Sequence, residues 1–149
     1  MKAFFFIDPG MKGGVAIALG SMDDLVTHNL DGIGSLEELL NDYECYDRRI
    51  ICENVPCFVG KNVPSHTSFK LGKSFGEIIG LARGMKISCE LIGPKVWQRG
   101  YDGLHGKVGM ARKRILKEHA KRLYPAAKAT LSTSDAILIG HFFLNNRNQ

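Results

Sequence analysis

The sequence contains little cysteine and no long apolar segment. Its four cysteines stand at irregular spacings without a C-x-x-C pair, and no two histidines accompany them at zinc-ligand spacing. We therefore expect buried free thiols in a reducing compartment, in place of disulfides or a zinc site. No run approaches the roughly 20 apolar residues of a membrane span. The apolar start ends at Asp8-Pro9-Gly10, too early for a secretory leader, so we expect a protein that stays where it is made and has no membrane partner.

Several motifs of common enzymes are also missing. Gly72-Lys73-Ser74 is similar to the end of a phosphate-binding loop, but Thr67 stands where that loop requires a glycine. No G-x-S-x-G marks a serine nucleophile, and no helix is expected directly after the glycines that follow Asp8. These absences argue against a P-loop nucleotidase, an esterase-type hydrolase and a dinucleotide-binding fold.

What is present fits one folded domain. The chain has 149 residues, of which 44% are hydrophobic and 23% charged. A chain of this size buries roughly two thirds of its surface on folding, so it needs no disulfide or structural metal. It contains no repeats, low-complexity tracts or linkers, and we expect a single domain over residues 1–149.

The charge is divided unevenly along the chain. Residues 1–58 carry 4 Lys or Arg against 10 Asp or Glu, whereas residues 59–128 carry 15 against 4. A basic central block beside an acidic amino-terminal third indicates a surface for polyanions next to a site that gathers carboxylates. The alternative is a soluble protein whose surface charge is merely uneven.

Apolar runs separated by turn residues predict strands that come first and then alternate with helices. The expected strands cover residues 2–7, 15–19, 25–30, 49–52 and 86–92. The expected helices cover residues 35–43, 66–84, 94–98, 107–124 and 132–144. The first helix would begin at Ser35 as its N-cap, with Glu38 completing a capping box. This order indicates an α/β fold in which helices flank a mixed five-stranded sheet.

Four glycines recur at every fourth position of the expected helix 66–84. Gly72, Gly76, Gly80 and Gly84 therefore lie in one stripe along a single helix face. Each interior glycine costs about 1 kcal/mol of helix stability relative to alanine. The stripe should offset this cost by some close approach, which is expected from the protein's own sheet, a second subunit or a nucleic-acid backbone.

Three acidic residues stand where elements begin or end. Asp8 ends the first strand, Glu53 ends the fourth, and Asp135 lies at the start of the last helix. If the first and fourth strands are neighbours, the three carboxylates meet at one end of the sheet, and they repel one another unless a cation neutralises them. Oxygen ligands suit Mg²⁺ or Mn²⁺, and two such ions can hydrolyse a phosphodiester. The alternative is that Asp8 caps a turn and Asp135 caps a helix.

The motifs also follow one another in a characteristic order over nearly the whole chain. They are Phe6-Ile7-Asp8-Pro9-Gly10 with Gly13-Gly14, Ile51-Cys52-Glu53, the helix 71–80, Gly93-Pro94 with Trp97, and Ser134-Asp135-Ala136. This ordered set resembles the RuvC-type Holliday junction resolvases of the ribonuclease H-like superfamily, most closely their phage, viral or mitochondrial-type branches. The resemblance implies a homodimer that resolves four-way DNA junctions by paired nicks, in the cytoplasm of a bacterial or virus-infected cell or in an organelle matrix.

The resemblance also assigns roles to individual residues. It implies that Asp8, Glu53 and Asp135 hold two Mg²⁺ or Mn²⁺ ions per site. The family usually has a further acid or a histidine three residues before the last aspartate, and here that position is Ser132. Ser132, water or another acid such as Asp102 would complete the coordination.

For DNA binding, the family carries a lysine at the position of Lys107 and a stacking aromatic at that of Phe58, while its dimer forms through the helix with Gly72, Gly76 and Gly80. Independently of the family, Arg112, Lys113 and Lys117 are candidates for phosphate contacts. The alternatives are a solvated helix face for the cations and core packing for Phe58. For the whole protein, the alternatives are a non-catalytic junction-binding protein and a nuclease for other branched DNA or for RNA–DNA hybrids.

Overall fold

The computed structural model describes residues 1–10, 12–57 and 63–147, and these form a mixed sheet between two groups of helices. The strand order is β3-β2-β1-β4-β5, with β1 antiparallel to β2 and parallel to β4. The strands are β1 (Lys2–Asp8), β2 (Gly14–Leu19), β3 (Val26–Asn29), β4 (Asp47–Glu53) and β5 (Ser88–Ile92). The α/β fold with a mixed five-stranded sheet is therefore confirmed.

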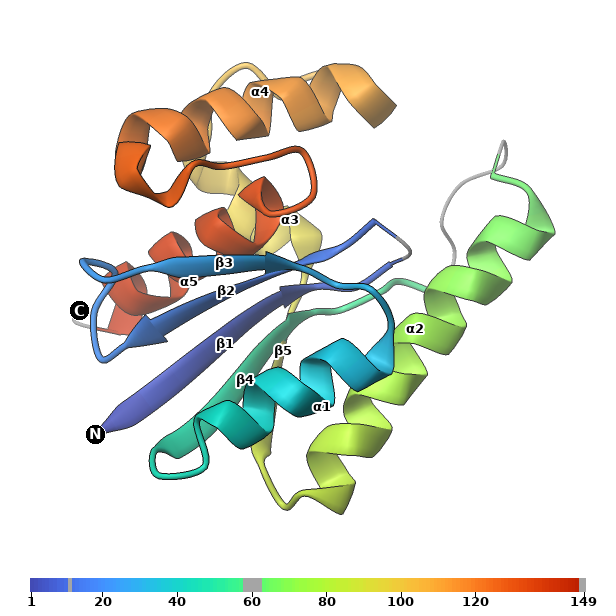
Figure 1. The fold of residues 1–149 in the computed structure, drawn as a ribbon. Coiled ribbons are helices and arrows are strands. Elements are labelled where there is room, and N and C mark those ends of the chain that lie inside the picture. Colours follow the sequence, from blue (N-terminus) through green and yellow to red (C-terminus); the bar gives the residue numbers. More distant parts are fainter. Residues whose placement is uncertain (11, 58–62, 148–149) are drawn as a thin grey trace.

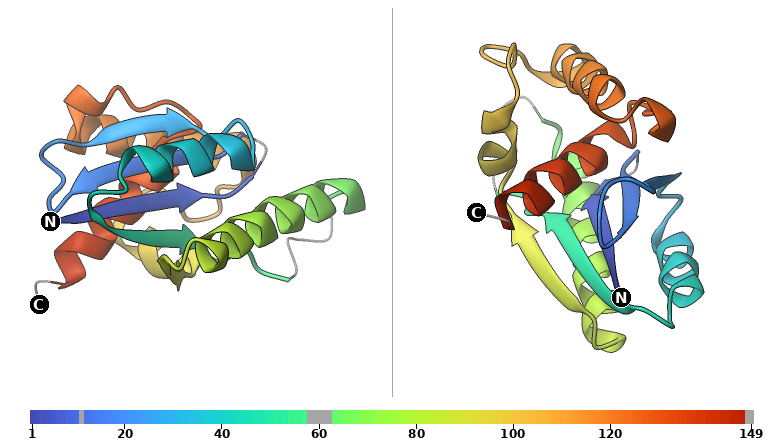
Figure 2. Two further views of the ribbon diagram at one scale, coloured as in Figure 1. Left: turned by 60° about the horizontal axis from the view of Figure 1, so that its bottom comes forward. Right: turned by 90° about the vertical axis from the view of Figure 1, so that its left-hand side faces the viewer.

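The helices divide between the two faces of this sheet, as Figures 1 and 2 show. On one face lie α1 (Ile33–Asp42) and α2 (Ser65–Gly84). On the other lie α3 (Pro94–Trp97), the 3₁₀ turns η1 (Gln98–Gly100) and η2 (Pro125–Ala127), α4 (Gly109–Leu123) and α5 (Ser134–Arg147). Helix α5 packs directly on β1 and β2, and α4 packs on α5.

The central strand β1 is buried on both faces because its apolar side chains alternate between the two helical layers. Phe4 and Phe6 belong to the core under α5, whereas Phe5 and Ile7 belong to the core under α1 and α2. The next residue, Asp8, follows the same period of two and faces the α5 layer. The sequence of β1 thus decides on which side of the sheet its terminal carboxylate lies.

Three predicted helix starts are wrong, among them that of the last helix, since α5 begins at Ser134 and not at residue 132. Helix α1 begins at Ile33 after Gly32, whose φ of 95° turns the chain into the helix, so Ser35 is not its N-cap. The Ser35 hydroxyl instead donates to the Gly32 carbonyl and accepts the Asp31 N–H, which removes the predicted capping box with Glu38. Helix α4 begins at Gly109, two residues later than predicted, because the glycine-rich loop continues to that residue with positive φ.

The glycine stripe of α2 does not pack against the sheet. A β-carbon at Gly72, Gly76, Gly80 or Gly84 would meet nothing within 4 Å in the described structure. The buried residues of α2 are Ile78 and Ala82, on the opposite side of the helix. The expectation that the stripe packs against the protein's own sheet is therefore wrong, and its face is open.

The cysteines agree only in part with the prediction of buried free thiols. All four cysteines are free thiols, but Cys45 and Cys57 are exposed and only Cys52 is buried, so the predicted burial is wrong for two of them. Among the helices of the described residues, none has the length and apolar character needed to cross a membrane.

Candidate active site

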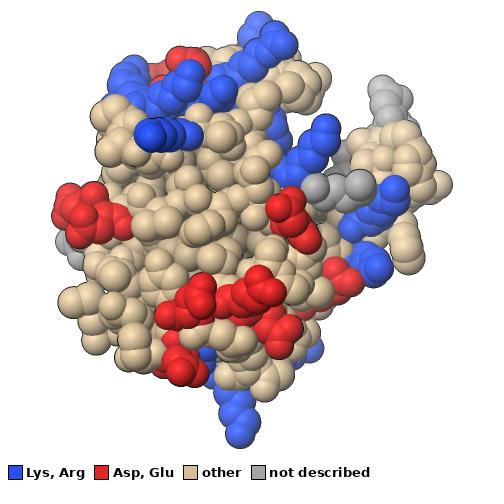
Figure 3. Space-filling model, viewed as in Figure 1, with Lys and Arg blue, Asp and Glu red and all other residues tan. Residues whose placement is uncertain are grey.

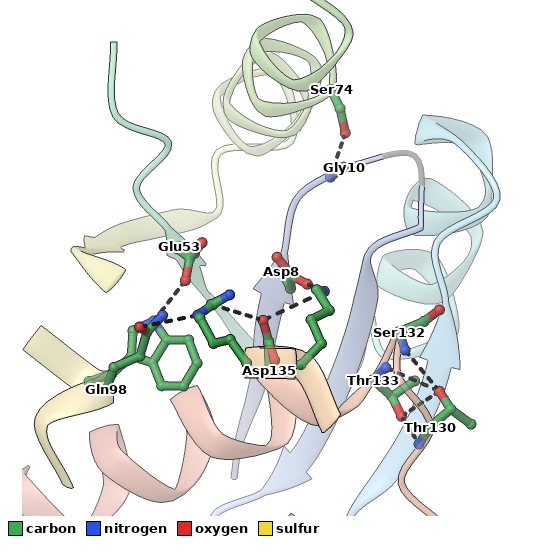
Figure 4. A network of polar contacts seen from close by, with 12 residues as sticks. Asp8, Gly10, Glu53, Ser74, Gln98, Thr130, Ser132, Thr133 and Asp135 are labelled. Atoms are coloured by element: carbon green, nitrogen blue, oxygen red, sulfur yellow. Dashed lines mark hydrogen bonds and ion pairs between the residues drawn. The ribbon is translucent and has the colours of Figure 1, made fainter. Parts of the chain in front are cut away.

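The parallel pairing of β1 with β4 brings Asp8 and Glu53 to the same end of the sheet. Ile7 lies opposite Cys52 in this pairing, so the two acidic residues follow as neighbours. Glu53 lies two residues after Ile51, so its side chain points to the same face of the sheet, and Ile51 packs in the core under α5. Both carboxylates therefore face the layer that contains α5, as Figure 4 shows.

The third acid, Asp135, comes from the first turn of α5, and its side chain is 2% exposed. The segment before the helix is fixed by two threonines: the Thr130 hydroxyl oxygen accepts the N–H groups of Ser132 and Thr133, and that of Thr133 accepts the Thr130 N–H. This segment lies so close to β2 that a β-carbon at Gly14 would overlap the Ser132 carbonyl oxygen. A glycine at position 14 is thus needed to place Asp135.

The three carboxylates line one open groove of about 660 Å³. Cationic side chains also line it, namely Lys12, Lys95, Arg112 and Lys113. Its walls include the apolar residues Val55, Pro56, Leu71, Pro94 and Val108. The groove combines a buried acidic floor with positive charge and apolar walls.

Helix α4 directs two cations at the carboxylates. The Lys113 Nζ atom lies 3.2 Å from Asp8 Oδ2 and 3.6 Å from Asp135 Oδ2, so it bridges β1 and α5. The Arg112 guanidinium lies 3.5 Å from Asp135 Oδ2, and its Nε donates to the Gln98 side-chain oxygen. Both residues were predicted to contact phosphate. In this structure they are half-buried and paired with acids, so they do not form a solvated helix face. They neutralise part of the acidic floor.

Glu53 has a different kind of partner. The indole Nε1–H of Trp97 donates a hydrogen bond of 2.8 Å to Glu53 Oε2. Trp97 is completely buried in the core under α5, so the donor is held by packing. Trp97 belongs to the family-like motifs of the sequence, but those motifs alone assign it no role in the site.

Burial and mutual repulsion raise the pKa of two of these carboxyl groups. Burial, followed by the charge of Asp135, raises the pKa of Asp8 to about 6, although Lys113 opposes the shift. Burial, followed by the charge of Asp8, raises the pKa of Glu53 to about 7. Burial alone would lower the pKa of Lys113, but Asp8 and Asp135 outweigh it and raise that pKa.

These residues fit a divalent cation. The Asp135 Oδ1 atom is buried and has no hydrogen-bond partner within the described part of the chain, which is costly unless a cation binds there. Carboxylate oxygens are the ligands that Mg²⁺ and Mn²⁺ prefer. No three acidic, cysteine or histidine side chains among the described residues already surround a common metal position. The Lys113 ammonium lies between two of the acids instead.

Several predicted site residues lie elsewhere. Ser132, Lys107 and Lys117 are not among the residues that line the groove, and neither is the exposed Asp102. Figure 4 shows Ser132 beside Thr130, on the other side of Asp135 from Glu53. Phe58 lies outside the described residues. The roles of these residues remain predictions.

Comparison with known proteins identifies the fold. No protein-family model matches the sequence. None of the curated proteins matches it either. The solved structures do: Thermus thermophilus RuvC in complex with a Holliday junction substrate superposes with a TM-score of 0.65 and 11% identity, covering 99% of this chain and 96% of that one. A second T. thermophilus RuvC structure gives a TM-score of 0.61 and 16% identity over 98% and 96% of the two chains.

The order of strands and the helices on both faces define a ribonuclease H-like α/β fold. Within that class, the chain has the RuvC-type arrangement over nearly its whole length. The resemblance noted in the sequence is confirmed at the level of the fold.

Proposed function

We propose that the protein is a divalent-metal-dependent endodeoxyribonuclease that resolves four-way DNA junctions by paired symmetric nicks. The observation that carries this proposal is the convergence of Asp8, Glu53 and Asp135, from three separate elements, in one groove with Arg112 and Lys113. Clustered carboxylates with an orphaned oxygen favour a cation, and the cations beside them favour a polyanionic substrate.

Asp8, Glu53 and Asp135 would hold Mg²⁺ or Mn²⁺, two ions per site as the family resemblance implies. When bound, these ions supply an activated water and stabilise the leaving oxygen of a phosphodiester. Arg112 and Lys113 would then be released from the carboxylates. Their five and three N–H donors suit the oxygens of a phosphate, so we assign them to binding the scissile strand.

The surface around the groove supports a nucleic-acid substrate. Figure 3 shows Lys and Arg gathered over α4 and Asp and Glu gathered around α1. The basic surface over α4 would bind DNA arms through phosphate contacts, for which Lys107 and Lys117 are candidates. Phe58 is kept as a candidate for stacking on an unpaired base. One matching T. thermophilus RuvC structure contains a Holliday junction substrate, which supports a junction as the substrate here. Such an enzyme would act where DNA is held, in a cytoplasm or an organelle matrix.

Paired nicks require two active sites, and we propose that the homodimer forms through α2. Gly72, Gly76 and Gly80 leave an open strip on the outer face of this helix. Phe69 lies on the same face and is 72% exposed, which is unusual for a large aromatic side chain. A second copy of α2 could approach this strip closely and cover Phe69.

The test is to incubate the protein with an end-labelled immobile junction, a linear duplex and an RNA–DNA hybrid, each with Mg²⁺ and with EDTA. We expect symmetric nicks confined to the junction and dependent on metal. Cutting of the hybrid or the linear duplex would retain the site but change the substrate. Asp8→Asn should abolish cleavage and leave junction binding intact, and cleavage that survives this substitution would contradict the proposal.

A non-catalytic junction-binding protein is the second candidate. It is favoured by the position of Ser132, which leaves the groove with three carboxylates and no fourth ligand from the segment before α5. This candidate predicts tight, salt-sensitive junction binding without nicking in Mg²⁺ or Mn²⁺. Turnover that appears only after Ser132→Asp would also favour it.

A further inference from the structure

The segment after β5 places two consecutive side chains beside the carboxylates: Trp97 lies in the core, and Gln98 lines the groove. Trp97 ends α3 and donates to Glu53 Oε2 at 2.8 Å. Gln98 begins η1 and accepts a hydrogen bond from Arg112, which in turn pairs with Asp135. One short segment thus contacts acids that come from β4 and, through an arginine, from α5.

Trp97 is the more rigid of these two contacts. Its side chain is completely buried, and its indole packs edge-on against the Tyr101 ring with the centroids 6.2 Å apart. An indole N–H can donate a hydrogen bond but cannot accept one or coordinate a cation. It can therefore orient a carboxylate without competing with that carboxylate for a metal ion.

Glu53 needs such a constraint more than the other acids do. A glutamate has one more rotatable bond than an aspartate, and each free torsion adds to the entropy lost when a side chain becomes a ligand. Asp8 and Asp135 already have their Oδ2 atoms held by Lys113. Among the described contacts of Glu53, the only side-chain hydrogen bond to its carboxylate comes from Trp97.

We propose that Trp97 is a positioning residue that holds the Glu53 carboxylate in the orientation in which it binds a divalent cation. This inference rests on the proposed function because it takes Glu53 as a metal ligand. Groups that orient metal ligands typically change metal affinity by about 10- to 100-fold when they are removed. Loss of the indole N–H should therefore weaken metal binding while leaving the rest of the groove in place.

The test compares Trp97→Phe with Tyr101→Phe. Trp97→Phe keeps an aromatic ring in the core and removes the donor to Glu53. Tyr101→Phe is the matched control, because its buried hydroxyl donates to the Leu138 carbonyl at 3.0 Å and not to an acid of the groove. Mn²⁺ binding is measured by calorimetry on the full-length protein without DNA, beside thermal unfolding in EDTA and junction binding in EDTA.

We expect Trp97→Phe to weaken Mn²⁺ binding by about tenfold or more. Tyr101→Phe should bind Mn²⁺ as the wild type does, even if both variants lose similar thermal stability. In a Glu53→Ala background, Trp97→Phe should cause no further loss, because the side chain that it orients is gone. Saturating Mn²⁺ should restore most cleavage to Trp97→Phe, since a positioning defect raises the metal concentration required more than it lowers the maximal rate.

Three results would overturn the inference: wild-type Mn²⁺ affinity in Trp97→Phe, an equal loss in Tyr101→Phe, or a full further loss in the Glu53→Ala background. These outcomes are separable from the proposed function, because Mn²⁺ binding is read without a substrate. If wild-type protein binds Mn²⁺ through Glu53 but cuts no junction, the proposed function fails and the role of Trp97 stands. If wild-type protein binds no Mn²⁺, both fail.

Discussion

Lys113 joins two elements of the groove through a single positive charge. Its ammonium contacts Asp8 on β1 and Asp135 on α5, whose side chains are 10% and 2% exposed. Removing one partner of a buried charge pair leaves the other partners uncompensated. The metal-free protein should therefore depend on this lysine for stability as well as for charge balance.

We predict that Lys113→Met lowers the free energy of unfolding in EDTA by about 1–3 kcal/mol. Methionine keeps most of the apolar stem, so the change isolates the ammonium. Added Mn²⁺ should stabilise this variant more than the wild type, because the cation no longer competes with Lys113. Urea unfolding with and without metal measures both effects. Lys117→Met, one helical turn further on and outside the groove, is the control, and equal stability of the two variants in EDTA would contradict the prediction.

The raised pKa values of Asp8 and Glu53 predict how stability depends on pH. The pKa rises from 3.8 to about 6 for Asp8 and from 4.5 to about 7 for Glu53 on folding. Between these values the folded protein retains protons that the unfolded chain has lost. The free energy of unfolding therefore falls as pH rises from about 4 to 7.

Thermal unfolding in EDTA between pH 4 and pH 7 checks whether stability falls as the pH rises. The wild type should lose stability toward neutral pH, and Glu53→Gln should lose less because one of the two titrating groups is gone. Saturating Mg²⁺ should remove much of the dependence, since metal binding favours the ionised carboxylates. A wild-type protein that becomes more stable from pH 5 to pH 7 in EDTA would show that these groups do not titrate as described.

At the scale of elements, the docking of α5 on the sheet positions Asp135. The helix approaches the sheet closely at Gly140, where a β-carbon would lie 2.6 Å from the Cδ2 atom of the buried Phe6 ring. We predict that Gly140→Ala destabilises the protein by about 1–3 kcal/mol through overpacking, although alanine favours helices. Gly76→Ala in α2 faces open space and should instead stabilise the protein by up to about 1 kcal/mol. Urea unfolding at low protein concentration distinguishes them, and stabilisation by both would refute the tight contact.

The elements themselves were largely predictable from the sequence. Apolar runs and turn residues predicted the strands. Asp8 and Glu53 each end one of these strands, which predicted that they could be neighbours. Their convergence with Asp135 followed once β1 and β4 were taken as adjacent, as the pairing of Ile7 with Cys52 bears out. These inferences succeeded because they depend on local periodicity and on where an element ends.

Features that depend on tertiary contacts were not predictable. Lys113 and Lys117 lie four residues apart on the same face of α4, but only Lys113 lines the groove. The packing of α4 on α5 decides which turn of the helix lies over the acids. The spacing of the glycines shows that they share one face of the helix, but it does not show whether that face packs against the sheet or is exposed. Trp97 stands out in the sequence as part of an ordered motif, yet only the fold brings its indole to Glu53.

The whole molecule presents three surfaces for its proposed task, of which the groove and the basic surface adjoin one another at Arg112 and Lys113 of α4. The groove lies at one end of the sheet, the basic side chains gather over α4, and the open face of α2 belongs to the opposite layer (Figures 1 and 3). Because the proposed dimer face lies outside the groove, assembly and chemistry can be altered independently. This separation makes the dimer testable without disturbing the carboxylates.

We predict that Gly76→Leu converts the protein to a monomer. A leucine there projects from the middle of the glycine strip and would hold a second α2 away, whereas the space around it in one chain is open, so the fold should persist. Gly34→Leu is the control, because Gly34 also faces open space on a helix but lies in α1. Sedimentation velocity gives the mass of each variant. The Gly76→Leu monomer should still nick junctions in Mg²⁺, but singly, so that nicked junctions accumulate in place of resolved duplexes. A Gly76→Leu protein that still sediments as a dimer and cuts in pairs would show that the subunits meet elsewhere.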